Sequence, residues 1–181
     1  MIYKVDRSVE QVVDEILVMD CQSGRAEAME ILVSRWQRRL WRYAYNLTGD
    51  TESAWDITQE SWVGIIRGIC RLNDPARFRS WAYRIVTNKA NDWIRKSKAE
   101  KQVSIENIQN HQHKEKKDIG LKELLEKLDI RKRAVISLYY LEQLSVSDIS
   151  SALNIPQGTV KSRLHDARKE LKELWQKHFG K

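Results

Sequence analysis

The sequence predicts an all-α protein made of two small helical domains joined by a flexible linker. Two observations support this prediction. Glycine and proline contribute only seven and two of the 181 residues, which leaves few of the turn residues that sandwiches and barrels need. Apolar residues also recur at helical spacing in two long stretches, and a polar segment from about 97 to 118 separates them.

Four helices are expected before the polar segment. The apolar pattern is helical from residue 9, and then over about 28–47, 53–70 and 78–96. The residues expected to face inward are Val9, Val12, Val13, Ile16 and Leu17 in the first helix, and Trp55, Trp62, Ile65, Ile66 and Ile69 in the third. An Asp-Pro step at 74–75 predicts a loop before the fourth helix, because a residue that precedes proline disfavours helical geometry.

The polar segment predicts the domain boundaries. Residues 97–118 are mostly Lys, Glu, Gln, Asn and His, with three sizeable apolar side chains among them. Such a stretch cannot bury enough surface to offset the entropy lost on ordering. We therefore expect one domain over 1–96, a linker over 97–118 and a second domain over 119–181.

The strongest local pattern lies within residues 144–168 and predicts a helix-turn-helix. Ser145 and Asp148 have the spacing of a capping box at the start of a helix. Asn154 suits a left-handed turn, and Pro156 stops the first helix while favouring the start of the next. The second helix then presents polar and basic side chains, as a helix that reads a DNA major groove does.

Positive charge is concentrated in two places, although the formal net charge is +7 overall. Residues 77–101 hold eight Lys or Arg against two acids, and residues 157–169 hold four against one. Two separate basic patches indicate a polyanion contacted at two sites. The alternative is that both are ordinary solvated faces.

Several classes of protein are disfavoured. Cys21 and Cys70 have no close partner in the sequence, which fits a reducing cytoplasm rather than a disulfide framework. No stretch approaches the roughly 20 apolar residues of a membrane span, so direct membrane insertion is not expected. His111 and His113 could ligate a metal but have no further ligands nearby, so neither a metal nor a cofactor is expected. Phosphate loops and nucleophile motifs are absent from the sequence, so we expect no catalytic residue and no small-molecule substrate.

Three segments resemble a known family. Residues 155–171 read IPQGTVKSRLHDARKEL and resemble region four of bacterial sigma factors of the extracytoplasmic-function (ECF) group. Residues 42–62 resemble the part of region two that grips core RNA polymerase, and residues 78–96 the part that melts and reads the minus-ten promoter element. The similarity covers residues from about 20 to 175.

The resemblance is to group 4 of the sigma-70 family. It implies a four-helix sigma region 2 domain followed by a helix-turn-helix sigma region 4 domain. It also implies an alternative sigma factor that binds core RNA polymerase, directs promoter-specific initiation and is held inactive by an anti-sigma factor until a signal arrives. Such a protein is not an enzyme, and it acts in the cytoplasm or is sequestered at the membrane by the anti-sigma factor.

The family's functional residues carry over by position. For contact with the clamp helices of core polymerase, the resemblance implies Asp56, Gln59 and Glu60. For the minus-ten DNA, it implies Leu72, Asn73, Arg77, Trp81, Arg84, Asn88, Lys89, Arg95 and Lys96. For the minus-thirty-five DNA, it implies Gln157, Gly158, Thr159, Lys161, Ser162, Arg163, His165 and Arg168. One departure from the family pattern is Asp129, where a proline is usual.

Two other functions fit a helix-turn-helix. A stand-alone transcription regulator would bind its operator without polymerase, commonly as a dimer. A DNA-processing enzyme would need a clustered acidic or metal site, and Asp56 with Glu60 is the one close acidic pair on a helical face of the N-terminal half with any claim to such a role. The resemblance explains that pair as a polymerase contact instead.

Overall fold

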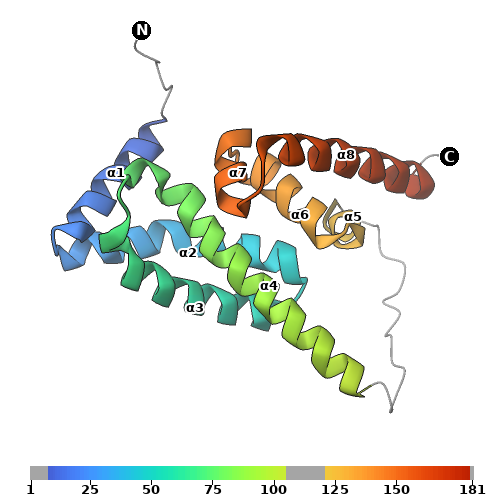
Figure 1. Ribbon diagram of the computed structural model, residues 1–181, viewed down its shortest axis with the longest axis horizontal. Helices are drawn as coiled ribbons and strands as arrows, with labels where there is room; N and C mark the ends of the chain where they lie inside the picture. Colours follow the sequence, from blue (N-terminus) through green and yellow to red (C-terminus); the bar gives the residue numbers. More distant parts are fainter. Residues whose placement is uncertain (1–7, 105–120, 180–181) are drawn as a thin grey trace, which may run out of the picture.

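The computed structural model describes residues 8–104 and 121–179, and in these ranges it contains helices and no strands (Figure 1). The first range forms α1 (Val9–Gln22), α2 (Ala26–Thr48), α3 (Thr51–Gly68), the 3-10 turns η1 (Ile69–Arg71) and η2 (Pro75–Arg77), and α4 (Phe78–Ser104). The second range forms α5 (Leu121–Lys127), α6 (Ile130–Ile136), the π-helical turn η3 (Ser137–Leu141), α7 (Val146–Leu153) and α8 (Gln157–Phe179). The predicted all-α fold is confirmed.

Helix α4 is longer than the sequence pattern predicts. It continues to Ser104, so residues 97–104 belong to the helix although their composition placed them in the linker. Lys, Ala, Glu and Gln dominate these residues, and all four favour helix, so nothing in the sequence stops α4 at residue 96. Residues 105–118, the remainder of the expected linker, lie outside the described residues.

Local capping signals are confirmed by the structure. Ser145 and Asp148 form the predicted capping box of α7, and Asn154 ends that helix in the left-handed conformation with φ 52°. Gly49 ends α2 in the same way with φ 73°, a value that favours glycine. Asp129, which departs from the family pattern, has a capping role of its own: its carboxylate accepts a hydrogen bond from the backbone N–H of Arg131 at the start of α6.

The inward face predicted for α1 is wrong in part. Val9, Val12 and Ile16 are exposed, and the buried side of the helix carries Asp14 and Leu17. The reason is an ion pair that the apolar pattern does not reveal. Arg35 of α2 approaches the Asp14 carboxylate to 3.1 Å, and this contact turns the acidic residue towards α2 and the apolar stripe outwards.

The inward face predicted for α3 is also wrong in part, because Trp55 and Ile66 are exposed while Trp62, Ile65 and Ile69 are buried. Small residues occupy the contact with α2 and α4 instead. Among them, Thr58 and Ser61 can be buried because each hydroxyl donates to a backbone carbonyl of its own helix, at 2.7 and 2.6 Å. The larger side chains at 55 and 66 therefore fall on the outer side.

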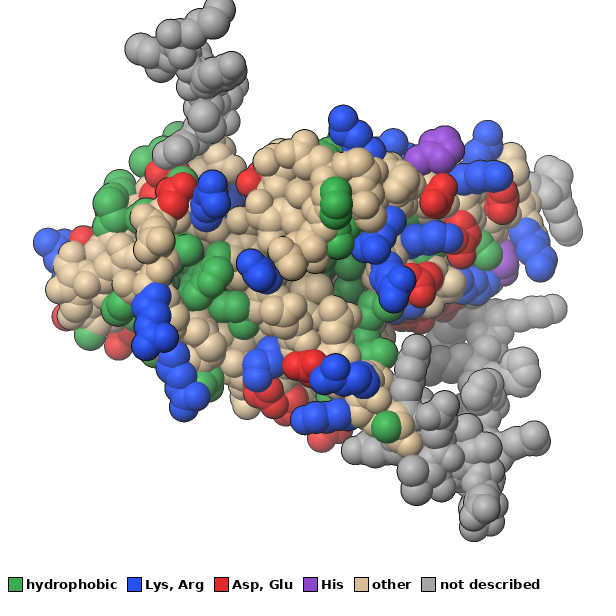
Figure 2. Space-filling view, in the orientation of Figure 1, with side chains coloured by type: hydrophobic (Ala, Val, Ile, Leu, Met, Phe, Trp, Pro, Cys, Tyr) green, Lys and Arg blue, Asp and Glu red, His purple; other side chains and the backbone are tan. Residues whose placement is uncertain are grey.

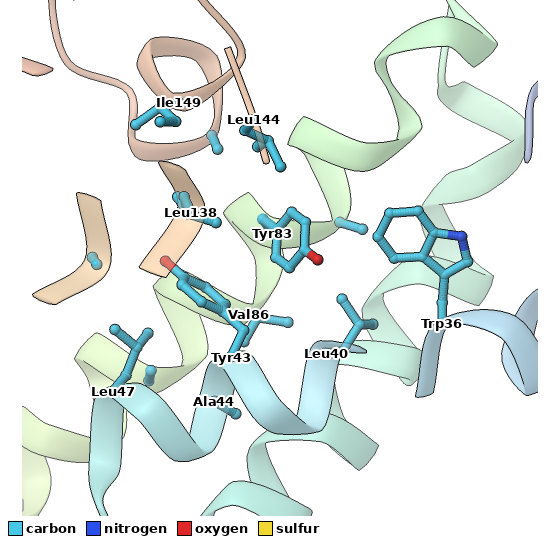
Figure 3. Packing of buried hydrophobic residues seen from close by; sticks show 14 of the residues in the cluster. Trp36, Leu40, Tyr43, Ala44, Leu47, Tyr83, Val86, Leu138, Leu144 and Ile149 are labelled. Atoms are coloured by element: carbon cyan, nitrogen blue, oxygen red, sulfur yellow. The ribbon is translucent and has the colours of Figure 1, made fainter. Parts of the chain in front are cut away.

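The two halves of the chain share one apolar core. Trp36, Tyr43 and Tyr83 are fully buried in the N-terminal half. Leu144 and Ile149 of the C-terminal half belong to the same cluster of buried side chains (Figure 3). Helix α7 packs on α4, and α6 packs on α2, so that the helix-turn-helix lies over the four-helix unit (Figure 1).

Within the described ranges, no helix combines the length and the apolar character that a membrane span requires.

Candidate nucleic-acid interface

The outer face of α3 combines acidic and apolar side chains. Asp56, Gln59 and Glu60, the residues expected to meet core polymerase, are all exposed on this face. Between and beside them lie Trp55, Val63 and Ile66, which are 42, 47 and 51% exposed. Large apolar groups exposed in a row and bordered by charge are typical of a protein-docking surface. The sequence analysis did not identify these three side chains as exposed. The run of small residues on the opposite side of α3 could have indicated that the opposite side is the buried one.

Glu60 is bound to a residue that was expected to contact DNA. The Nζ of Lys89 on α4 donates to a Glu60 carboxylate oxygen at 2.8 Å. This hydrogen bond lowers the pKa of Glu60 below its usual value. The pair ties α3 to α4 at the border between the two expected binding faces.

The loop between α3 and α4 forms one wall of a pocket of about 510 Å³. Five of the nine residues expected to bind minus-ten DNA line it together: Leu72, Asn73, Arg77, Trp81 and Arg84. An aromatic ring, an amide and cationic groups around one hollow are suited to hold an unstacked base next to its phosphate.

Gln22 holds this loop in place from α1. Its side-chain amide donates to the backbone carbonyls of Ile69 and Leu72, at 2.9 and 2.8 Å. Within the loop, the Asp74 carboxylate accepts from the backbone N–H of Ala76 at 3.0 Å. Sequence reasoning missed Gln22, and no local pattern could have found it because its partners lie 47 and 50 residues away.

The other minus-ten candidates lie outside this pocket. Asn88, Arg95 and Lys96 are exposed further along α4, with Arg95 about three helical turns beyond Arg84. Arg95 pairs with Asp92 of the same helix at 2.9 Å. Figure 2 shows Lys and Arg side chains gathered over this end of α4 and along α8, interspersed with acids.

The helix-turn-helix has the expected geometry. The backbone N–H of Ile155 donates to the Ser150 carbonyl at 3.1 Å, and the Ser150 hydroxyl donates to the Ile155 carbonyl at 2.6 Å, which fixes the turn. Val160 and Leu164 are buried against α7. Of the residues expected to read the minus-thirty-five element, Gln157, Gly158, Lys161, Ser162, His165 and Arg168 are exposed, while Thr159 and Arg163 are half-buried.

Two arginines of α8 face protein groups. Arg163 lines a second pocket together with Thr87 and Asn91 of α4. Arg168 donates from Nε to the Tyr140 hydroxyl at 2.8 Å, and its guanidinium lies 5.6 Å from the ring centroids of both Tyr139 and Tyr140. In this arrangement Arg168 is held against two tyrosines, and Arg163 borders α4.

No metal centre is found among the described residues, which hold no group of three or more His, Cys, Asp and Glu side chains that could bind an ion. His111 and His113 lie outside the described residues. Asp56 and Glu60 lie on an open helix face rather than in a cavity.

Family models match both halves of the chain. The model for Sigma-70 region 2 matches residues 32–100, and the model for Sigma-70 region 4 matches residues 119–171. The first range contains α3 with its outer face and most of α4, and the second contains the helix-turn-helix.

Curated relatives span most of the chain. It is 30% identical to RNA polymerase sigma factor SigV of Bacillus subtilis, over 71% of this chain and 80% of that protein. It is 26% identical to ECF RNA polymerase sigma factor SigW of the same organism, over 86% and 93%. It is 29% identical to ECF RNA polymerase sigma factor SigE of Mycolicibacterium smegmatis over 81% of this chain, a match that spans only 61% of that protein.

Two solved structures have the same fold. CnrH in complex with the cytosolic domain of CnrY gives a TM-score of 0.69 at 25% identity, over 91% of this chain and 97% of that one. The sigma factor RpoE of Bartonella quintana, solved with the anti-sigma factor NepR, gives a TM-score of 0.69 at 22% identity, over 81% and 96%.

Proposed function

The chain belongs to the ECF group of the sigma-70 family, and from that premise we propose that it binds core RNA polymerase and directs initiation at specific promoters. We also propose that an anti-sigma factor holds it inactive until a signal arrives. The chemistry of transcription belongs to the polymerase, so the chain needs no catalytic residue or cofactor of its own. Its place of action is the cytoplasm.

The observation that carries this proposal is the separation of two kinds of surface on one four-helix unit. The outer face of α3 presents Trp55, Val63 and Ile66 among acids, which suits a protein partner. The loop pocket with Trp81 and Arg84 presents aromatic and cationic groups, which suits a nucleic acid. A sigma factor has to hold both partners at once.

We assign the loop pocket to the minus-ten element and the start of α8 to the minus-thirty-five element. A base that leaves the duplex costs a few kcal/mol of stacking, which contacts with Trp81 and Asn73 can offset. The first turns of α8 present Gln157 and Lys161 for base edges or phosphates. We also propose a first domain over 1–96, a linker over 97–118 and a second domain over 119–181, with α4 running on into the start of the linker as far as Ser104.

The regulation by a partner rests on family membership and on one relative of the same fold. CnrH was solved in complex with the cytosolic domain of CnrY. Such a partner could bind on two exposed apolar surfaces of this chain. One is formed by Trp55, Val63 and Ile66 of α3, and the other by Val9, Val12 and Ile16 of α1.

A run-off transcription assay tests the proposal. The purified chain is mixed with core RNA polymerase and a library of genomic fragments, and we expect transcripts that start at defined promoters. Core enzyme alone is the control. If no promoter-specific transcript appears while the chain alone footprints duplex DNA tightly, the protein is a stand-alone regulator instead.

A further inference from the structure

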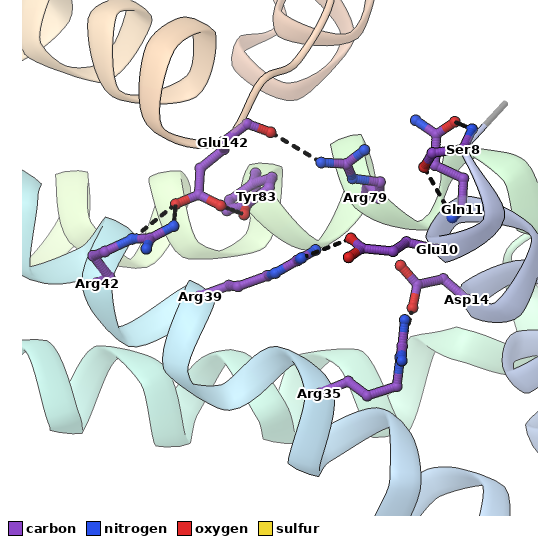
Figure 4. A network of polar contacts seen from close by, with 10 residues as sticks. All are labelled: Ser8, Glu10, Gln11, Asp14, Arg35, Arg39, Arg42, Arg79, Tyr83 and Glu142. Atoms are coloured by element: carbon purple, nitrogen blue, oxygen red, sulfur yellow. Dashed lines mark hydrogen bonds and ion pairs between the residues drawn. The ribbon is translucent and has the colours of Figure 1, made fainter. Parts of the chain in front are cut away.

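Glu142 is a buried acid at the contact between the helix-turn-helix and the four-helix unit (Figure 4). Its Oε1 accepts from Nη2 and Nε of Arg42, at 2.6 and 3.2 Å, and its Oε2 accepts from the Tyr83 hydroxyl. Arg79 donates to its backbone carbonyl at 2.9 Å. One acid of the C-terminal half thus receives donors from both α2 and α4 of the N-terminal half.

Arg133 of α6 makes a second polar contact between the two halves. Its Nη1 donates to the backbone carbonyl of Leu47 in the last turn of α2, at 3.3 Å. Its Nη2 donates to the carbonyls of Glu126 and Leu128 at the end of α5, at 2.6 and 2.9 Å. Carbonyls at the end of a helix have no partner within it, so a cation there is stabilising. Together with the shared apolar core, these contacts hold the chain in a closed arrangement.

The closed arrangement places the helix-turn-helix along one side of α4. Arg84, Asn88 and Asn91 follow one another at helical spacing and are exposed, so they lie on one side of that helix. Arg84 lines the loop pocket together with Ser151 of α7. Asn91 lines the neighbouring pocket together with Arg163 of α8. The helix-turn-helix therefore borders, at two points, the side of α4 that carries the proposed DNA contacts Arg84 and Asn88.

The closed arrangement also holds the two proposed DNA-reading parts too close together for a promoter. The minus-ten and minus-thirty-five elements are named for positions about 25 base pairs apart, which at roughly 3.4 Å per base pair is about 85 Å of duplex. Arg84 and Asn91 are seven positions apart, about 10 Å along α4, and the helix-turn-helix borders both of their pockets. A chain that binds both elements at once therefore has to open.

We propose that this contact is autoinhibitory: the closed helix-turn-helix obstructs the DNA-facing side of α4, and the pair of Glu142 and Arg42 holds it there. The outer face of α3 stays accessible, since Trp55 and Ile66 are exposed in the closed chain. Closure thus blocks DNA while it leaves the proposed polymerase face free. This inference rests on the proposed function, which assigns DNA to α4, and it adds a form of regulation that needs no second protein.

The first test uses the full chain without polymerase and two variants with opposite changes of charge. Glu142→Gln removes a negative charge from the pair, and Arg42→Gln removes a positive one. Each leaves the other member without its opposite charge, which weakens the closed arrangement. We expect a larger radius of gyration for both in small-angle X-ray scattering. Because only the open fraction binds DNA, we also expect roughly tenfold tighter binding of both to a fluorescent single-stranded oligonucleotide of mixed sequence, measured by anisotropy.

Glu170→Gln is the control matched for charge. It also removes one negative charge and breaks a 2.7 Å ion pair, but that pair, with Lys132, lies within the C-terminal half. A general effect of charge would tighten DNA binding for Glu142→Gln and Glu170→Gln and weaken it for Arg42→Gln. Autoinhibition instead predicts tighter binding for both members of the closing pair and no change for Glu170→Gln.

Arg42→Gln keeps the test decisive if Glu142→Gln does not fold, because the Arg42 side chain is 48% exposed. The proposal is overturned if Arg42→Gln binds the oligonucleotide no more tightly than the wild type does. It is also overturned if the radius of gyration of Arg42→Gln equals that of the wild type.

Run-off transcription keeps this inference apart from the proposed function. A chain that gives no promoter-specific transcript with core polymerase refutes the sigma-factor activity, whatever the scattering shows. A chain that transcribes from defined promoters, while Glu142→Gln and Arg42→Gln match it in scattering and in oligonucleotide affinity, refutes only the autoinhibition.

Discussion

Trp81 lies directly against Gly68, so closely that a Cβ added to the glycine would be 2.8 Å from the indole ring. The contact joins the last residue of α3 to the first turns of α4 and fixes the ring at the wall of the loop pocket. Position 68 is therefore glycine because the Trp81 ring approaches the backbone of α3 closely there. We assign the Trp81 ring to base stacking, and its orientation therefore depends on position 68 of α3 having no side chain.

Gly68→Ala should displace Trp81 and weaken promoter melting. Stacking of a base on an aromatic side chain contributes about 1–3 kcal/mol, so we expect a loss of about tenfold in open-complex formation, measured by permanganate reactivity of the minus-ten region. Gly64→Ala is the matched control on the same helix, since its Cβ would lie 3.3 Å from Cγ2 of Ile85 and away from Trp81. If both variants melt the promoter equally well, Trp81 does not bind the unstacked base.

The exposed apolar side chains of α3 should contribute to polymerase affinity without contributing to stability. Ile66→Ala shortens a side chain that is half-exposed, so the unfolding free energy should change by less than about 1 kcal/mol. The affinity for core polymerase, measured by fluorescence, should fall by about 1–2 kcal/mol if the face docks there.

The double variant Gln59→Ala with Glu60→Ala should lose core affinity as well, and with enough core enzyme to restore the complex it should still start transcription at the same promoters. Val86→Ala, which creates a cavity in the buried face of α4, is the contrasting variant and should lose stability. The assignment of α3 to polymerase fails if Ile66→Ala and the double variant bind core enzyme as wild type does.

The ion pair of Lys89 and Glu60 predicts a pH dependence with a defined sign. The pKa of Glu60 is lowered in the folded chain, chiefly by the hydrogen bond from Lys89. Its contribution to stability is therefore present above the pKa of the unfolded chain and is lost as the pH falls through the lower folded value. Because the side chains of Lys89 and Glu60 are 39 and 64% exposed, solvent screening keeps that contribution below about 1 kcal/mol.

Lys89→Met should raise the pKa of Glu60 towards its usual value, which carboxyl NMR titration measures directly. The control is Lys132→Met, which breaks the pair with Glu170 in the other half and should leave Glu60 unchanged. A Glu60 carboxylate that titrates identically with and without Lys89 would show that the pair does not persist in solution.

Much of the fold could be predicted because its signals are local. The capping box of Ser145 and Asp148 and the left-handed turn at Asn154 depend on residues three to nine positions apart, and both were correct. The faces of α1 and α3 were wrong in part because burial depends on the neighbouring helix. Small residues can form a contact, as Ser61 does, and an ion pair can turn an acid inwards, as Asp14 shows.

Which residues belong to the candidate site could be predicted from the sequence, but their arrangement in space could not. Sequence similarity selects Trp81 and Arg84, and the structure brings them into one pocket. The partners that position them, Gln22 on α1 and Gly68 on α3, act across distances in the sequence that no periodic pattern encodes. The same holds for Glu142, whose partner Arg42 is 100 residues away.

Arg163 and Arg168 of α8 both face protein groups, but replacing them should have different effects. Arg168 is held by Tyr140 through a 2.8 Å hydrogen bond and lies near the rings of both tyrosines, so its side chain serves the fold of the C-terminal half. Arg163 instead lines the pocket that it shares with Thr87 and Asn91 of α4, and its guanidinium is the contact that we propose for the minus-thirty-five element.

Arg163→Ala should therefore weaken use of the minus-thirty-five element by about 1–3 kcal/mol and relax the choice of base at one position, while core affinity stays unchanged. Arg168→Ala should instead lower the urea midpoint of unfolding by an amount that corresponds to about 1 kcal/mol, with promoter choice retained. Transcription from a set of single-base promoter variants, read alongside urea unfolding, separates the two. If Arg168→Ala relaxes base choice and Arg163→Ala does not, Arg168 leaves Tyr140 to read DNA and the roles of the two arginines are reversed.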